Sequence, residues 1–161
     1  MIVKFNLLFV TFLNIGRIKF APGTFASFFT CLLFLFLESF INIKILFIIT
    51  LLIFIYSIIA INKVINHFES EDPREIVIDE FVGQMLALLA IPMYQNFYPT
   101  FDVYYCVFAF FLFRLFDIWK PFPVSYVDKN IKGGFGIMLD DVLAGIYVII
   151  FMTITFFILG Y

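Results

Sequence analysis

The stretch ILFIITLLIFIYSIIAI, residues Ile45–Ile61, decides the fold class because it contains no charged side chain. An apolar stretch of about 18 or more residues can cross the hydrocarbon core of a bilayer as an α-helix. Comparable runs occur at Phe25–Ile41, from after Glu80 to about Phe97, at Val103–Phe116 and at Val142–Leu159, with Pro92 interrupting the second of these. The pattern predicts an all-α protein, a polytopic membrane helical bundle of four to five spans.

The composition supports a lipid-embedded chain. Of 161 residues, 64% are hydrophobic and only 14% are charged, whereas about a quarter of a soluble domain is charged. Ten basic and twelve acidic side chains are too few to cover the surface of so apolar a globule. The high hydropathy, the net charge of −2 and the two distant cysteines exclude a disordered chain, a coiled coil, a nucleic-acid binder and a disulfide-stapled domain.

The basic residues predict the orientation of the bundle. With a cytoplasmic amino terminus, Lys44 is the one cation outside, and nine lie inside, namely Lys4, Arg17, Lys19, Lys63, Arg74, Arg114, Lys120, Lys129 and Lys132. This is a strong positive-inside bias. We expect residues 1–161 to form one membrane-embedded domain. Its residues 1–20 are expected to form a retained interfacial segment, because no small-residue cleavage site follows the first apolar run.

Five carboxylates fall at three predicted helix ends on this cytoplasmic side. Asp79 and Glu80 start the third predicted span, Asp117 ends the fourth, and Asp140 and Asp141 start the fifth. Acids at helix N-termini interact favourably with the macrodipole, so capping is one interpretation. Capping explains one acid per helix but not adjacent pairs, and five clustered carboxylates would take up protons unless a cation held them. The alternative is an oxygen-ligand site for Mg²⁺, and the spacing leaves both open.

Glycines accompany two of these acids at the same spacing. Gly83 follows Asp79 by four residues, and Gly145 follows Asp141 by four residues, so each lies about one turn below its acid on the same face. Small residues at these positions would let two helices approach closely. A shared metal site requires such an approach.

Groups suited to phosphate surround the acids in the sequence. Arg114 precedes Asp117 by three residues, Lys120 precedes two prolines, and a glycine-rich segment, Gly133, Gly134 and Gly136, leads into the last predicted helix. Thr24 follows Pro22-Gly23 at the start of the first span. The alternatives are an ion pair, a snorkelling lysine, a glycine turn and a helix cap. His67, the single histidine, is interpreted as a solvated loop residue.

Carboxylates with an arginine and a lysine at one membrane face indicate metal-assisted hydrolysis or transfer at the phosphate of a lipid. One histidine cannot supply the two that acid-phosphatase-like lipid phosphatases need. The Asp-x-Asp nucleophile of haloacid-dehalogenase phosphatases and the long signature of CDP-alcohol phosphotransferases are also absent from the sequence.

Four blocks of the chain resemble the bacterial phosphatidylglycerophosphatase A family. They are Ala21-Pro22-Gly23-Thr24, Asp72-Pro73 with Ile76–Gly83, Phe113–Pro123, and Gly133–Asp141 with Ala144-Gly145. They occur in order from about Gly16 to Gly145, and the Phe-Arg-x-x-Asp-x-x-Lys-Pro and Gly-Ile-Met-x-Asp-Asp patterns are the most distinctive. One departure is Ala26, where the family often has glycine.

The resemblance implies a Mg²⁺-dependent phosphatase of the bacterial inner membrane that converts phosphatidylglycerol phosphate to phosphatidylglycerol and inorganic phosphate. We expect Asp79, Glu80, Asp140 and Asp141 to bind metal, with one of them free to orient or deprotonate water. Asp117 is either a further ligand or the partner of Arg114. Arg114 and Lys120 are expected to hold the phosphate, with Thr24 and the glycine-rich segment as second contacts. A divalent-cation transporter and a metal-dependent lipid phosphotransferase are the alternatives.

Overall fold

The described residues form an all-helical protein. The computed structural model describes residues 2–68, 73–92 and 102–158, and these contain no strand. The elements are α1 (Ile2–Val10), the 3₁₀ helix η1 (Ile15–Arg17), α2 (Pro22–Leu37), α3 (Ile43–Val64), the 3₁₀ helix η2 (Ile65–His67), α4 (Ile78–Leu88), α6 (Asp102–Trp119), α7 (Val124–Asn130) and α8 (Gly133–Ile158). The predicted all-α class is confirmed.

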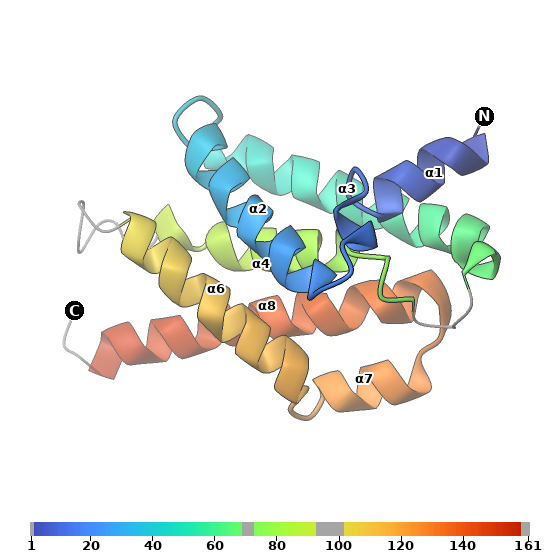
Figure 1. Cartoon of the computed structure of the whole chain (residues 1–161). Helices are drawn as coiled ribbons and strands as arrows, with labels where there is room; N and C mark the ends of the chain where they lie inside the picture. Colours follow the sequence, from blue (N-terminus) through green and yellow to red (C-terminus); the bar gives the residue numbers. More distant parts are fainter. Residues whose placement is uncertain (1, 69–72, 93–101, 159–161) are drawn as a thin grey trace.

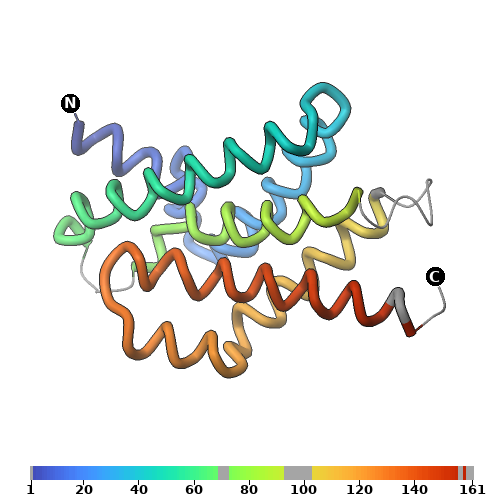
Figure 2. The backbone as a smooth tube through the Cα atoms, turned by 180° about the vertical axis from the view of Figure 1, so that it is seen from behind, coloured from blue at the N-terminus to red at the C-terminus, as the bar shows by residue number. Residues whose placement is uncertain are grey.

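Helix α4 forms the centre of the bundle. It contacts α2, α3, α6 and α8, and Figures 1 and 2 show it enclosed between them from opposite sides. Most of its side chains are buried, including Phe81, Val82, Met85 and Leu88. At 11 residues it is shorter than the roughly 20 residues that cross a bilayer. The segment predicted as the third span is therefore a buried core helix as far as Leu88. The end of that predicted span, residues 93–97, lies outside the described residues.

Two described helices are long and apolar enough to span a membrane, Ile43–His67 and Gly133–Thr155. The apolar helix α2 has 16 residues, which is short for a span. The predicted number of four to five spans is thus not confirmed. Only 28% of the apolar 18-residue segment within Ile43–His67 is buried, whereas the core helix of a soluble protein is mostly buried.

Large apolar side chains cover the outer faces of the long helices. They include Phe28, Leu32 and Phe36 on α2, Phe47, Leu51 and Ile55 on α3, Phe111 and Leu115 on α6, and Ile150 and Ile154 on α8. An apolar surface of this extent is costly in water. Together with the two long apolar helices, it is consistent with membrane association.

Helix α8 begins at Gly133, nine residues before the predicted start at Val142. The segment expected to be a glycine-rich loop is therefore the first turn of the helix. Asp140 and Asp141 lie two turns inside it rather than at its N-terminus. The capping interpretation is wrong for these two acids, because only the first turn of a helix presents free N–H groups.

The amino-terminal helix α1 is attached to the bundle. The Tyr56 hydroxyl on α3 donates a 2.8 Å hydrogen bond to Asn6 Oδ1, and the rings of Phe9 and Tyr56 meet edge to face at 4.9 Å. The Val77 N–H donates a 3.0 Å hydrogen bond to the Val10 carbonyl. The end of α1 is thereby held beside the entry to α4, while its interfacial location stays a prediction.

Candidate active site

One cavity brings together the charged residues singled out from the sequence. Its volume is about 350 Å³, and α2, α4, α6 and α8 contribute to its walls. Its lining includes Thr24, Asp79, Glu80, Arg114, Asp117, Lys120, Asp140 and Asp141. We call it the carboxylate cavity. Residues more than a hundred positions apart in the chain thus converge on one place, as the sequence predicted.

Three of the carboxylates form a tight group. Asp79, Glu80 and Asp141 each offer an oxygen, and these oxygens lie within 4.8 Å of one another. Asp141 is only 3% exposed. Within the described part of the chain, the buried atoms Glu80 Oε2 and Asp141 Oδ2 have no hydrogen-bond partner. Buried like charges with unsatisfied oxygens need a proton or a cation, so the donor set fits a hard divalent ion such as Mg²⁺.

The close approach of α4 and α8 depends on two glycines. A Cβ on Gly83 would lie 2.5 Å from the Asp141 carbonyl oxygen, and one on Gly145 would lie 2.5 Å from the Gly83 carbonyl oxygen. Real Cβ atoms do not approach backbone oxygens so closely. The predicted role of these glycines is confirmed, because without them Asp141 could not lie beside Asp79.

A third glycine, on α2, admits the Glu80 side chain. A Cβ on Gly23 would lie 2.0 Å from Glu80 Oε1 and 3.3 Å from Arg114 Nη1. The carboxylate and the guanidinium therefore both lie against the backbone of α2 at this point. Because Gly23 has no side chain, the backbone of the first turn of α2 forms one wall of the site.

The environment of Glu80 favours its protonated form. Burial raises the pKa of Glu80 to about 7, although its hydrogen bond with Asp79 opposes the rise. The negative charge of Asp117 also raises the pKa, and the positive charge of Arg114 lowers it. Near neutral pH this carboxyl is therefore easily converted between its proton-bound and cation-binding forms.

Arg114 is fixed by neighbours on two helices. Its Nη1 lies 2.9 Å from Asp117 Oδ2, one turn further along α6, and donates a 3.5 Å hydrogen bond to Ser27 Oγ on α2. Its buried Nε has no hydrogen-bond partner among the described residues. A guanidinium presents several donors in a fixed fork, so Arg114 retains a donor for an anion.

Lys120 is held by two carboxylates on different helices. Its Nζ donates a 2.7 Å hydrogen bond to Asp140 Oδ2 on α8 and another to Asp128 Oδ1 on α7. Burial alone would lower the pKa of Lys120, but these two hydrogen bonds and the two negative charges outweigh it and raise the pKa above its usual range. Lys120 therefore stays protonated. Asp140 faces this lysine and lies outside the group formed by Asp79, Glu80 and Asp141.

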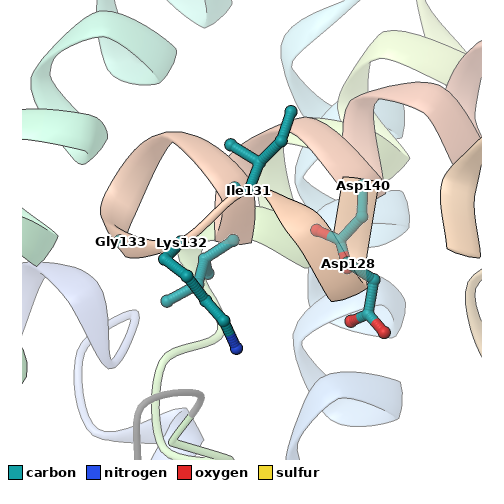
Figure 3. Close-up of a pocket in the computed structure, with 7 residues that line it drawn as sticks. Asp128, Ile131, Lys132, Gly133 and Asp140 are labelled. Atoms are coloured by element: carbon teal, nitrogen blue, oxygen red, sulfur yellow. The ribbon is translucent and has the colours of Figure 1, made fainter. Parts of the chain in front are cut away.

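Asp128 is a site residue that the sequence reasoning missed. Figure 3 shows it with Asp140 in a small cavity of about 40 Å³ beside the carboxylate cavity. It is separated from Lys120 by two prolines and lies on the seven-residue helix α7, so no helical spacing links the two residues. Gln84 was also missed. Its side chain is fully buried one turn from Glu80, and neither amide atom has a hydrogen-bond partner among the residues described.

The glycine-rich segment lies to one side of this arrangement. The Gly134 N–H donates a 2.7 Å hydrogen bond to Asn62 Oδ1 on α3, and a Cβ on Gly136 would lie 1.8 Å from the Ile131 carbonyl oxygen. Gly133, with a φ of 74°, is in the left-handed region. None of the three lines the carboxylate cavity. Their placement favours a packing role at the start of α8 over the predicted phosphate contact.

The remaining expectations concern single residues. His67 is exposed at the end of η2, in agreement with its interpretation as a solvated residue. Cys31 and Cys106 are both buried free thiols.

Known proteins have sequences similar to this chain. A phosphatidylglycerophosphatase A of Haemophilus influenzae is 42% identical over 135 residues, which cover 84% of this chain and 78% of that protein. A Bacteroides thetaiotaomicron protein, provisionally named a phosphatidylinositol-3-phosphatase, is 44% identical over 98 residues, or 59% of this chain and 58% of that protein. The phosphatidylglycerophosphatase A of Escherichia coli is 41% identical over 75 residues, which are 47% of this chain and 40% of that protein.

The similarity extends through nearly the whole chain. No solved structure matches this chain significantly. The sequence pattern of the family described as Phosphatidylglycerophosphatase A matches residues 8–156, which include every residue of the carboxylate cavity. The chain therefore belongs to the phosphatidylglycerophosphatase A family.

Proposed function

We propose that the protein hydrolyses phosphatidylglycerol phosphate to phosphatidylglycerol and inorganic phosphate. The observation that carries this proposal is that Asp79, Glu80 and Asp141 converge in one cavity with the cations Arg114 and Lys120. Family membership supplies the substrate class. Water attacks phosphorus, the bond between phosphorus and the glycerol oxygen breaks, and that oxygen takes up a proton.

Mg²⁺ is the proposed cofactor, held by Asp79, Glu80 and Asp141. When bound, it would neutralise charge on the phosphate oxygens and activate water for attack. The unsatisfied oxygens Glu80 Oε2 and Asp141 Oδ2 are the observations that support this ligand set. Asp140, bound to Lys120, positions that lysine in this account rather than contacting the ion.

The cationic side chains are proposed to bind the phosphate. Arg114 offers its unpaired Nε, and Lys120 offers a permanently charged ammonium held by Asp128 and Asp140. Charge-assisted hydrogen bonds of this kind stabilise the negative charge on the transferring group. The Thr24 side chain, in the first turn of α2, is proposed as a second contact to the phosphate. Asp117 keeps the guanidinium of Arg114 oriented.

The site is proposed to face the cytoplasm at the bacterial inner membrane, in a multi-pass protein. The positive-inside bias of nine cations against Lys44 supports this orientation. The apolar outer faces of the long helices supply the surface that lipid would cover. A substrate headgroup would then reach the carboxylate cavity from the membrane surface.

A phosphate-release assay on the purified protein tests the proposal. We expect Mg²⁺-dependent release from phosphatidylglycerol phosphate that exceeds release from phosphatidic acid, phosphatidylinositol 3-phosphate and a water-soluble phosphate ester. Asp79→Asn and Asp141→Asn should each abolish release without loss of folded protein, whereas the matched control Glu38→Gln should not. Full activity of both aspartate variants would contradict the site, as would cation uptake into liposomes without hydrolysis. Phosphate transfer to an added alcohol in preference to water would contradict hydrolysis.

A further inference from the structure

A second cavity, lined by cations, adjoins the carboxylate cavity. Its volume is about 530 Å³, and its lining includes Arg17, Lys19 and Arg74, with Glu75 as the one acid among the described residues. We call it the basic cavity. Among the described lining residues, three positive charges stand against one negative charge, whereas acids predominate among those of the carboxylate cavity.

The two cavities share a wall. Ala21, Pro22 and Arg74 line both of them. Ala21 has a φ of 45°, so the chain turns sharply there between the segment carrying Lys19 and the start of α2. A ligand with two anionic groups a few bonds apart can therefore reach both cavities across this turn.

The backbone holds the cation-bearing segments together. A Cβ on Gly16 would lie 1.9 Å from the Glu75 carbonyl oxygen, so the two segments are in direct backbone contact. The Val77 N–H bond to the Val10 carbonyl, 3.0 Å long, fixes the same junction. Arg17 and Arg74, each next to one of the contacting residues, are thereby brought to one cavity from different parts of the chain.

The three cations have no structural partner in the described part of the chain. Arg114 and Lys120 are fixed by ion pairs, but Arg17, Lys19 and Arg74 are exposed and make no ion pair with any described residue. Clustered cations repel one another, and a cavity lined by them attracts anions. Packing and ion pairing therefore do not account for this cluster.

We propose that Arg17, Lys19 and Arg74 form a subsite for the phosphodiester group of the lipid substrate. The subsite rests on the proposed function, because phosphatidylglycerol phosphate carries a phosphodiester one glycerol away from the phosphomonoester to be removed. The basic cavity holds the retained diester while the carboxylate cavity acts on the monoester. The subsite thereby selects two-phosphate lipids over lipids with a monoester alone.

Kinetics on three substrates test the subsite. The substrates are phosphatidylglycerol phosphate in detergent micelles, its deacylated water-soluble form, which keeps the diester, and glycerol phosphate, which lacks it. The double variant Arg17→Ala/Lys19→Ala, at two cations that line the basic cavity alone, should raise KM for the first two by roughly tenfold or more, since hydrogen bonds to charged groups are lost, with kcat little changed. Glycerol phosphate hydrolysis should stay unchanged. Lys63→Ala, which removes an exposed cation outside both cavities, is the matched control.

A conservative variant separates loss of charge from loss of folding. Arg17→Lys/Lys19→Arg should recover most of the wild-type KM. An equal loss on all three substrates would overturn the proposal, because it would place these cations in the common reaction rather than at the diester. An effect confined to the micellar substrate would overturn it too, because that result assigns the cations to attraction to the lipid surface.

Direct binding distinguishes a failed subsite from a failed proposed function. Glycerophosphoglycerol carries the diester without a monoester, so titration calorimetry measures its binding whether or not the protein hydrolyses anything. Binding to wild type that is lost in Arg17→Ala/Lys19→Ala supports the subsite. Binding that is unchanged in the variant overturns it, and binding of inorganic phosphate alone with the same dependence shows a general anion site and overturns the diester assignment.

Discussion

Replacing Gly23 by alanine would disturb the active site without disturbing the fold. The added Cβ would lie 2.0 Å from Glu80 Oε1, and ordinary van der Waals contact begins at 3.4 Å, so the oxygen must retreat by about 1.4 Å. The atom that must move is the end of a flexible side chain rather than backbone. Alanine is a better helix former than glycine, and the φ of Gly23 is not in the left-handed region. The substitution should therefore displace a metal ligand while leaving the stability of α2 unchanged or slightly improved.

A displacement of about 1 Å at a reacting centre can cost on the order of 10²-fold in rate. We expect Gly23→Ala to lower kcat/KM by about that factor, together with a weakened Mg²⁺ dependence, at an unchanged Tm. The assay is phosphate release over a range of Mg²⁺ concentrations, with thermal unfolding measured on the same preparation. A wild-type kcat/KM in Gly23→Ala would contradict this prediction, because it would mean that hydrolysis does not depend on the position of the Glu80 carboxylate. A large fall in Tm would refute the claim that the change is local.

Three further predictions follow from the same contacts. In metal-free protein, Glu80 has a raised pKa of about 7 against an ordinary value of 4.5, so between these pH values the folded state binds a proton that the unfolded state has lost. Tm should therefore fall as pH rises through this interval. Glu80→Gln should flatten this dependence in thermal scans. Gly145→Ala, with its Cβ 2.5 Å from the Gly83 carbonyl, should destabilise the protein by about 1–3 kcal/mol in denaturant titrations, and an unchanged midpoint would contradict the helix contact. Asp128→Asn should weaken the hold on Lys120 and lower kcat/KM several-fold, whereas wild-type kinetics would assign Asp128 no part in the site.

The gathering of the acids was predictable because each lies at the end of an apolar run in the sequence. What spacing could not decide is which acids share a point in space. Asp140 and Asp141 are neighbours, but successive helical residues are about 100° apart, so they face different partners. Asp141 joins Asp79 and Glu80, whereas Asp140 binds Lys120. Helical geometry favours this division once α8 is known to contain both residues.

Two features of the fold were beyond reach of the sequence for a physical reason. The glycines Gly133 and Gly134 disfavour a helix locally, but the Gly134 N–H bond to Asn62 and close packing on α3 start α8 there. The apolar run after Glu80 has the same hydropathy whether it faces lipid or protein. Contact with four neighbouring helices makes α4 a buried core helix, and that contact comes only from tertiary structure.

The proposed activity depends on a divalent ion held by Asp79, Glu80 and Asp141. Phosphate release from phosphatidylglycerol phosphate, measured before chelation, after chelation and after Mg²⁺ is restored, is the decisive experiment. We expect chelation to abolish release and Mg²⁺ to restore it in the wild type but not in Asp141→Asn. Undiminished release after complete removal of divalent metal would contradict it.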